Sequence, residues 1–361
     1  MTKSILIVDD SALVRKQLGE MIATLDFEIE FAKNGKEAVE KATAFQFNVI
    51  TMDINMPVMD GIEAVRQIMQ NQPTPILMVS SLTTDDATIT MDAMDLGAVD
   101  YIAKPGTMNV GKSENREEIL SKVNSLSRIS PRRLKRKMAR PATRERRRAE
   151  PRERTSSQTR TANTPELTSK DIEKIVLIGS STGGPGLIEQ ICSSLPANFK
   201  HPVCIVQHMP EQFTAAFAER LDKASILPVV ESKQNMEVLP GHVYVARGGV
   251  HMHFAKKVSG KIVIREEKRK GDNFFQPSVN EMMHSSLDVF DGKKLVGVIL
   301  TGIGDDGADA MVSIKKAGAY TLGENEESAT VYGMPKEAYD RGGVQEQLSF
   351  PALLKKISTL R

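Results

Sequence analysis

The chain has 361 residues, of which 40% are hydrophobic, and its formal net charge is +2 at pH 7. This length predicts two or three domains, each with its own core. The two cysteines, Cys192 and Cys204, lack CxxC spacing, and no apolar run approaches the ~20 residues that span a bilayer. We therefore expect a soluble cytoplasmic protein without disulfides or membrane insertion.

From Ser4 to Lys104, short β-rich runs alternate with amphipathic stretches of helical period. The runs read SILIV, FEIEFA, FNVITM, PILMVS and VDYIA. Strands that alternate with helices indicate a parallel sheet covered by helices on both faces. We expect residues 1–120 to form this first α/β domain.

Polar residues stand at the carboxyl ends of these runs, where open parallel sheets bind ligands. They are Asp9, Asp10, Asp53, Ser80, Ser81 and Lys104. Clustered carboxylates raise one another's pKa, and a hard cation such as Mg²⁺ relieves their repulsion. One carboxylate would then attack a phosphoryl donor while the lysine and serine hold its oxygens. Helix caps and surface charges are the alternative, but they explain such residues at four of the five strand ends poorly.

These residues resemble the motif set of response-regulator receiver domains. The resemblance implies a flavodoxin-like, doubly wound sheet of five parallel strands, with phosphorylation by a histidine kinase in the presence of Mg²⁺. It implies these roles: Asp53 as phosphoacceptor; Asp9, Asp10, Asp53 and the backbone carbonyl of Asn55 as Mg²⁺ ligands; Ser80 as switch hydroxyl; Tyr101 as coupled aromatic; and Lys104 as phosphate-sensing lysine.

A basic segment separates the two halves of the chain. Between Arg128 and Arg160 there are 14 Lys and Arg against three Glu, and no aromatic residue occurs from Gly111 to Asn198. Such a composition cannot bury enough apolar surface to fold alone. We expect residues 121–170 to form a flexible linker. Docking onto an acidic partner or nucleic acid is an alternative role, but no motif for specific nucleic-acid readout accompanies the charge.

From Lys174 onward the strand and helix patterns resume, and residues 171–361 are expected to form a second α/β domain. IVLIG, VCIVQH, LVGVIL and AYTLG read as strands of a mostly parallel sheet, and HVYVARGGVHMHF reads as antiparallel hairpins. His251 and His253 alternate there, where a metal pair is an alternative to packed histidines, although no third ligand stands nearby.

The stretch Val176–Gly186, VLIGSSTGGPG, runs from a strand into a glycine-rich turn. Its glycines do not fit a dinucleotide site, and it lacks the lysine of a phosphate-binding P-loop. It does match G-x-S-x-G, the pattern of a nucleophile elbow, although an ordinary tight turn is an alternative. Ser180 and Ser181 both remain candidates at this point.

Two later strand ends favour a nucleophilic serine. VCIVQH ends in His208, and LVGVIL leads into a glycine turn with Asp305 and Asp306. If these strands are neighbours, a serine, a histidine and an aspartate meet at one edge of the sheet, as in serine hydrolases. The chain order Ser, His, Asp differs from the order of α/β-hydrolases. Backbone amides of the glycine turns would bind the oxyanion.

The segments IGSSTGG, QHMP, LPGHVYVA, PSV, GVILTGIGDDGADAM and YGMPKEA resemble the catalytic domain of CheB, the chemotaxis protein-glutamate methylesterase. The resemblance implies hydrolysis of glutamate methyl esters on the cytoplasmic helices of chemoreceptors, with release of methanol and in many members deamidation of glutamine. It places the triad on Ser181, His208 and Asp306 and an oxyanion donor on the backbone of Ile303, without a cofactor for the esterase step.

The chain departs from the family pattern in two places. Asp305 adds an acid beside Asp306, and the stretch that usually reads Arg-Pro-Ser-Val-Asp is QPSVN, residues Gln276–Asn280. The extra acid would favour the protonated form of His208 or disfavour an acidic substrate surface, and the second departure bears on substrate preference. The rival hypothesis is a phosphorylation-dependent binding module that turns nothing over. The receptor, the pathway and the oligomeric state do not follow from the sequence.

Overall fold

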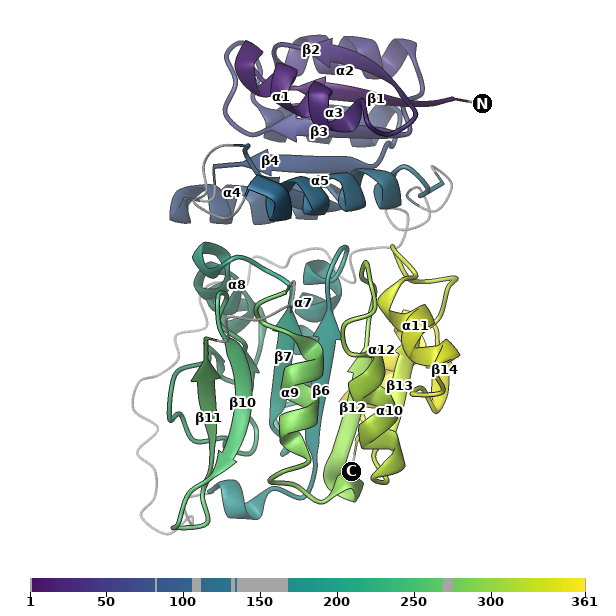
Figure 1. Ribbon diagram of the computed structural model, residues 1–361. Coiled ribbons are helices and arrows are strands. Elements are labelled where there is room, and N and C mark those ends of the chain that lie inside the picture. Colours follow the sequence, from purple (N-terminus) through teal and green to yellow (C-terminus); the bar gives the residue numbers. More distant parts are fainter. Residues whose placement is uncertain are drawn as a thin grey trace.

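A computed structural model describes residues 2–81, 83–105, 112–130, 134, 168–268 and 275–360. The described residues form two α/β domains, and the first lies against one end of the second (Figure 1). Most of the basic segment lies outside the described residues, so its expected flexibility remains a prediction. None of the helices in the described ranges has the length and apolar character of a membrane span.

The first domain is built on five parallel strands in the order β2-β1-β3-β4-β5. The expected strands are all present: β1 (Lys3–Val8), β2 (Phe27–Ala32), β3 (Val49–Asp53), β4 (Ile76–Ser80) and β5 (Asp100–Ala103). The order is that of flavodoxin-like sheets, and it confirms the predicted doubly wound fold.

Helices cover both faces of this sheet: α1 (Ala12–Ile22), α2 (Gly35–Ala44), α3 (Gly61–Asn71), α4 (Thr84–Asp95) and α5 (Lys112–Leu126). Ser11, Asn34, Asp60 and Thr83 start the first four, because each side chain accepts a hydrogen bond from a backbone N–H of the first turn. Helix α5 runs to Leu126, so it crosses the domain boundary expected at residue 120.

The second domain contains a seven-stranded parallel sheet in the order β14-β13-β12-β6-β7-β9-β8. Its strands are β6 (Ile175–Ser180), β7 (Val203–Gln207), β8 (Val229–Glu231), β9 (Val243–Val245), β12 (Leu295–Ile299), β13 (Tyr320–Glu324) and β14 (Glu346–Leu348). Strand β6 lies between β7 and β12, where the winding direction reverses, and such points form ligand crevices.

The hairpin prediction was only partly right. Strands β10 (His251–Lys256) and β11 (Ile262–Glu267) form an antiparallel pair outside the main sheet. Strand β9, expected in a hairpin, instead pairs in parallel with β7 and β8. The alternating pattern of HVYV indicated a strand but carried no information about the direction of its partner.

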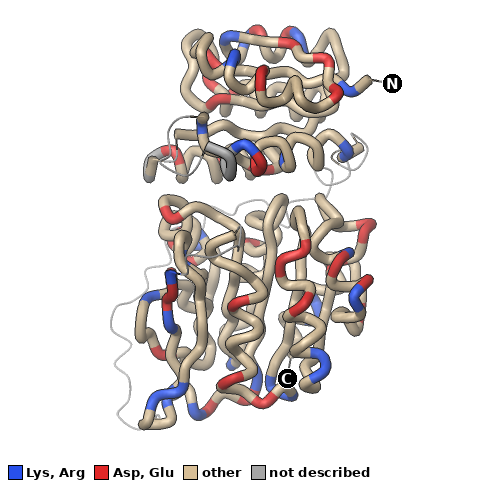
Figure 2. Tube along the Cα trace, in the orientation of Figure 1, with Lys and Arg blue, Asp and Glu red and all other residues tan. Residues whose placement is uncertain are grey.

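Helices of the second domain also lie on both faces of the sheet. They are α7 (Pro185–Ser194), α8 (Glu211–Ala224), α9 (Val279–Ser286), α10 (Ala308–Lys316), α11 (Met334–Asp340) and α12 (Phe350–Ser358), with short 3₁₀ turns η1 (Ser169–Asp171) and η2 (Gly292–Lys294). Apolar residues of α7, α8 and α12 pack in one core, and those of α9, α10 and α11 pack in another. Charged residues of both signs lie mainly on helices and loops (Figure 2).

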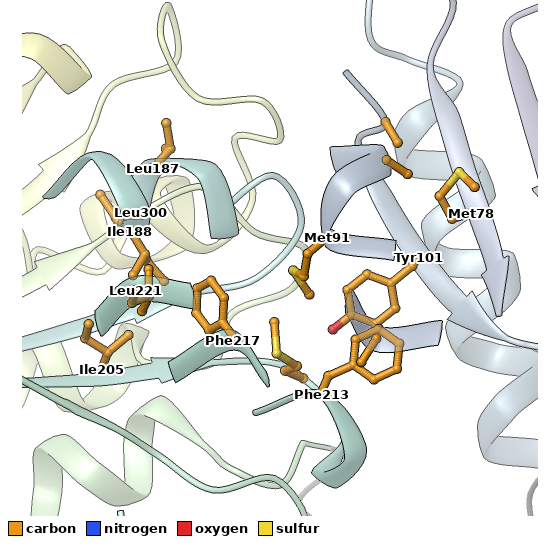
Figure 3. Close-up of a cluster of buried hydrophobic side chains, with 14 of the residues drawn as sticks. Met78, Met91, Tyr101, Leu187, Ile188, Ile205, Phe213, Phe217, Leu221 and Leu300 are labelled. Atoms are coloured by element: carbon orange, nitrogen blue, oxygen red, sulfur yellow. The ribbon is translucent and has the colours of Figure 1, made fainter. Parts of the chain in front are cut away.

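The core on the α7–α8 face continues into the first domain. Met91 on α4 and Tyr101 on β5 meet Phe213 and Phe217 on α8 (Figure 3). The rings of Tyr101 and Phe213 are stacked, with centroids 4.7 Å apart and 9° between their planes. At the rim, Arg220 of α8 is paired with carboxylates of α4. The two domains therefore share buried apolar surface.

Candidate active site

The turn after β6 holds two serines in different environments. Ser180 is fully buried, and its hydroxyl donates a hydrogen bond to Oε1 of Gln207 at 2.7 Å. Ser181 is 5% exposed, and its hydroxyl makes no hydrogen bond within the described residues. Gly183 has a φ of 79°, and a Cβ there would lie 2.6 Å from Cβ of Thr330, so the turn requires glycine.

His208 lies beside Ser181 because β6 and β7 are neighbours. The last residues of the two strands are paired in register, so Ser181 and His208 occupy the next positions. Nε2 of His208 lies 2.7 Å from Oδ2 of Asp306, and Nδ1 is buried without a partner among the described residues. The ring of Phe275 stacks on the imidazole with centroids 3.9 Å apart. One ring nitrogen is therefore bound to a carboxylate, and the other is available.

Asp306 lies in the turn after β12, at the N-terminus of α9. Oδ1 accepts the hydroxyl of Ser278 at 2.7 Å and the N–H of Asn280 at 3.0 Å, and Oδ2 accepts the N–H of Val279 at 2.6 Å. The open amides of a helix N-terminus favour a negative charge. Burial acts to raise the pKa of Asp306, but these amides and His208 hold the pKa below its ordinary value.

The two departures from the family pattern have different surroundings. Asn280 also accepts the N–H of Ala310 at 2.9 Å, so it connects α9 with the start of α10 near Asp306. Asp305 is exposed and pairs with Arg341, whose Nη2 lies 2.5 Å from Oδ2. The extra acid is therefore matched by a surface cation.

Three backbone amides belong to the Ser181 turn or to the turn after β12 that packs against it. The Gly302 N–H donates to the Val331 carbonyl at 3.1 Å, whereas the amides of Thr182 and Ile303 donate no hydrogen bond within the described residues. A Cβ on Gly302 would lie 2.9 Å from Cβ of Ser181, so this turn packs directly against the serine. The residue after the nucleophile and a second loop typically supply the oxyanion donors of serine hydrolases.

The acidic residues of the first domain meet as expected. Ligand oxygens of Asp9, Asp10 and Asp53 lie within 4.8 Å of one another. Nζ of Lys104 lies 2.9 Å from Oδ2 of Asp53 and 3.3 Å from Oδ2 of Asp9. Burial raises the pKa of Asp53 to about 6, against the opposing effect of Lys104 and with a smaller contribution from Asp9. The repulsion between carboxylates that we expected is present, but burial contributes more to the raised pKa of Asp53.

The two expected switch residues, Ser80 and Tyr101, contact different parts of the protein. Ser80 is buried, and its carbonyl accepts the N–H of Lys104 at 2.8 Å. Tyr101 is 2% exposed and faces Phe213 of the second domain rather than this cluster. Burial raises the pKa of Tyr101 well above its ordinary value. Asn55 is exposed in the turn after β3.

His251 and His253 are bound to other groups. Nδ1 of His251 accepts the N–H of Ser278 at 3.2 Å, and Nε2 of His253 lies 3.1 Å from Oε2 of Glu281. Within the described ranges, the acidic cluster of the first domain is the one group of three side chains placed to share an ion. Each hairpin histidine therefore has at least one polar partner within the second domain.

The sequence analysis did not identify three side chains near the Ser181 turn, those of Gln207, Thr182 and Glu324. Nε2 of Gln207 donates to the Ser181 carbonyl at 2.9 Å, and the hydroxyl of Thr182 donates to Asp100 of the first domain. Glu324 is fully buried at the end of β13. A polar residue at the end of an apolar strand is a usable signal for Gln207 and Glu324, but no local pattern marks the Asp100 contact.

Comparison with known proteins places both domains. The family model described as CheB methylesterase matches residues 176–357, and the response regulator receiver domain model matches residues 5–114.

A protein-glutamate methylesterase/protein-glutamine glutaminase of Carboxydothermus hydrogenoformans is 44% identical over 99% of this chain and 98% of its own length. One of Caldanaerobacter subterraneus is 41% identical over 98% and 96%. The crystal structure of the Thermotoga maritima CheB methylesterase catalytic domain has a TM-score of 0.50 and 37% identity, covering 52% of this chain and 98% of that one. The chain therefore belongs to the CheB methylesterase family.

Proposed function

We propose that the chain is a receiver-controlled serine hydrolase that demethylates glutamate methyl esters on chemoreceptors. The contact between His208 and Asp306, beside the uncommitted hydroxyl of Ser181, is the observation that carries this proposal. The names of the whole-length relatives support the ester and amide of a protein side chain as substrates.

In the proposed reaction, Nδ1 of His208 takes the proton of the Ser181 hydroxyl as Oγ bonds to the ester carbonyl carbon. Asp306 accepts the Nε2–H and stabilises the imidazolium. The tetrahedral intermediate expels methoxide, which leaves as methanol with the proton from His208. Water then attacks the acyl-enzyme by the same route and releases the glutamate carboxylate. General-base assistance of this kind contributes roughly 10²–10⁴-fold.

The amides of Thr182 and Ile303 would bind the oxyanion of each intermediate. Both N–H groups are uncommitted within the described residues; Thr182 follows Ser181 in its turn, and Ile303 follows Gly302, which packs against Ser181. Preorganised donors stabilise the developing charge without reorganisation during the reaction. The Gly302 amide is not included, because it already donates to Val331.

Relatives that carry both enzyme names favour a second reaction at the same site. A glutamine side chain presents a carboxamide in place of the ester, and attack by Ser181 would give the same acyl-enzyme. Ammonia would then leave with the proton from His208. Hydrolysis of the acyl-enzyme again yields glutamate, so one set of residues serves both substrates.

Asp53 would accept a phosphoryl group from a histidine kinase. Its burial next to Asp9 and Asp10 fits a Mg²⁺ ion, because the site brings carboxylate oxygens together and raises the pKa of Asp53 to about 6. The ion would be held by these three residues and the Asn55 carbonyl, and it would neutralise charge on the phosphoryl group. Lys104 would move its ammonium from Asp53 to a phosphoryl oxygen.

Control of the esterase would act through the shared interface. The stack of Tyr101 on Phe213 and the hydrogen bond from Thr182 to Asp100 tie the first domain to the turn that carries Ser181. Phosphorylation that weakens these contacts would open the site to the receptor. Coupling between two sites is typically ~1–3 kcal/mol.

The test uses methyl-labelled receptor membranes and the full-length protein, with methanol release as the readout. Ser181→Ala should abolish release, and Ser180→Ala should retain most of it because Ser180 is bonded to Gln207. Equal release by wild type and Ser181→Ala would remove the esterase proposal. The binding-module hypothesis predicts no release by any of these proteins.

The basic segment is tested separately. Deletion of residues 130–160 should leave the affinity for nucleic acid unchanged, in keeping with a spacer. A large, salt-sensitive loss of that affinity would favour an electrostatic docking role instead.

A further inference from the structure

Glu324 is a charged residue buried directly behind the candidate active site. It is the last residue of β13, and its side chain has no exposed surface. Oε2 accepts the N–H of Thr301 at 3.0 Å, and Oε1 accepts the hydroxyl of Ser328 at 2.9 Å. Carboxylates are rarely buried to this extent, because loss of water is costly unless hydrogen bonds replace it.

The Thr301 N–H needs this acceptor because the strand ladder ends before it. The register of β12 with β13 runs as far as Ile299 and Gly323. Thr301 is fully buried, so water does not reach its amide. The side chain of Glu324 thus continues the ladder where the backbone no longer does.

Thr301 also forms hydrogen bonds with Ser181 and Thr182, the two residues that follow β6. Its carbonyl accepts the Ser181 N–H at 3.0 Å, and its hydroxyl donates to the Thr182 carbonyl at 2.8 Å. The hydroxyl also accepts the N–H of Val331 at 2.9 Å. The Ile303 amide, which with the Thr182 amide is a proposed oxyanion donor, follows two residues later in the chain. A shift of Thr301 would therefore displace the nucleophile and both proposed oxyanion donors together.

We propose that Glu324 is a positioning residue for ester hydrolysis, which rests on the proposed function. Its carboxylate holds Thr301, and Thr301 sets the Ser181 hydroxyl and the Ile303 amide relative to each other. The essential property is an acceptor oxygen at the Thr301 N–H. A glutamine side chain has nearly the same shape as glutamate and still carries an acceptor oxygen. A leucine side chain fills a similar space but has no acceptor.

The experiment compares Glu324→Gln and Glu324→Leu in the full-length protein, with methanol release from methyl-labelled receptor membranes. Glu324→Leu should lower kcat by roughly 10²-fold, as loss of an oxyanion donor does, with KM changed less than about threefold. Glu324→Gln should stay within about threefold of wild type in both constants. Circular dichroism and phosphorylation of Asp53 confirm that each variant is folded.

A folded Glu324→Leu protein with wild-type kcat would overturn the proposal, and so would equal losses in the Gln and Leu variants. If Glu324→Leu does not fold, Glu324→Asp takes its place, because the shorter side chain withdraws the acceptor. We then expect at least a tenfold loss of kcat, and an unchanged kcat overturns the proposal. Failure of the wild type to release methanol would instead refute the proposed function.

Discussion

The hydroxyl of Thr182 donates a hydrogen bond to Oδ2 of Asp100, so the residue after Ser181 is bonded directly to the receiver domain. Lys122 lies 3.4 Å from the same Asp100 oxygen, which anchors this carboxylate within its own domain. Tyr101, the next residue, stacks on Phe213 of α8. Two adjacent residues of β5 thus contact the Ser181 turn and the core of the second domain.

Loss of the aromatic stack should release the esterase from control. Such stacks contribute about 0.5–1.5 kcal/mol beyond their buried area. Phe213→Leu keeps apolar volume but removes the ring that meets Tyr101. We expect unphosphorylated activity to rise roughly 2- to 10-fold, measured as methanol release without a phosphodonor. Phe350→Leu is the control, because α12 packs on α7 and β13. Equal rates in all three proteins would argue against control through this contact.

The two neighbouring aspartates should differ sharply in importance. Asp306 accepts the His208 ring N–H, whereas Asp305 pairs with Arg341 on the surface. Asp306→Asn should lower kcat by roughly 10³–10⁴-fold with little change in KM, because the imidazolium loses its carboxylate. Asp305→Asn should stay within about threefold of wild type. A large loss for Asp305→Asn alone would reverse the assignment.

Asp53 should destabilise the protein at neutral pH. Burial raises the pKa of Asp53 in the folded state to about 6, whereas the ordinary value in the unfolded state is 3.8. Between these two pH values the folded state therefore retains a proton that the unfolded state has released. Its contribution to stability is present below the unfolded pKa and is lost as the pH rises through about 6. Asp53→Asn should therefore raise the free energy of unfolding by up to about 3 kcal/mol at neutral pH, and by little near pH 4.

The same pair of proteins tests the metal site. Mg²⁺ should raise the melting temperature of the wild type and have much less effect on Asp53→Asn, because one carboxylate ligand is gone. The difference is measured by thermal unfolding with and without Mg²⁺ at constant ionic strength. Equal shifts in both proteins would place the ion elsewhere.

His201 should make the protein sensitive to mild acid. It is 1% exposed, and neither ring nitrogen has a partner within the described residues. Burial, and then Lys174 and Lys200, lower the pKa of His201 below 6.5. The unfolded state therefore binds more protons below about pH 6.5, and stability falls as the pH is lowered. His201→Phe should weaken this dependence in urea unfolding between about pH 7.5 and 5.5. An identical pH profile would contradict the assignment.

Strand ends could be predicted because hydrophobic runs and the residues that follow them are local features. Asp53, Lys104 and His208 each follow an apolar run, and parallel strands bring their carboxyl ends to one edge. The same reasoning mistook β9 for part of a hairpin, because periodicity does not record the direction of a partner strand.

The choice between neighbouring residues needed side-chain environments. Ser180 and Ser181 are equivalent in a G-x-S-x-G context until the first is found bonded to Gln207. Asp305 and Asp306 separate only because one meets Arg341 and the other meets the N-terminus of α9. Each distinction depends on a partner at least 27 residues away in the chain.

The sequence by itself determined two α/β domains, the acidic cluster and the set of strand ends from which the serine, histidine and aspartate come, because composition and periodicity act along the chain. The tertiary structure alone decided how Tyr101 and Asp100 meet the catalytic domain and how Glu324 lies behind Thr301. Those contacts depend on the packing of separate elements, and no local pattern encodes the distance between two surfaces.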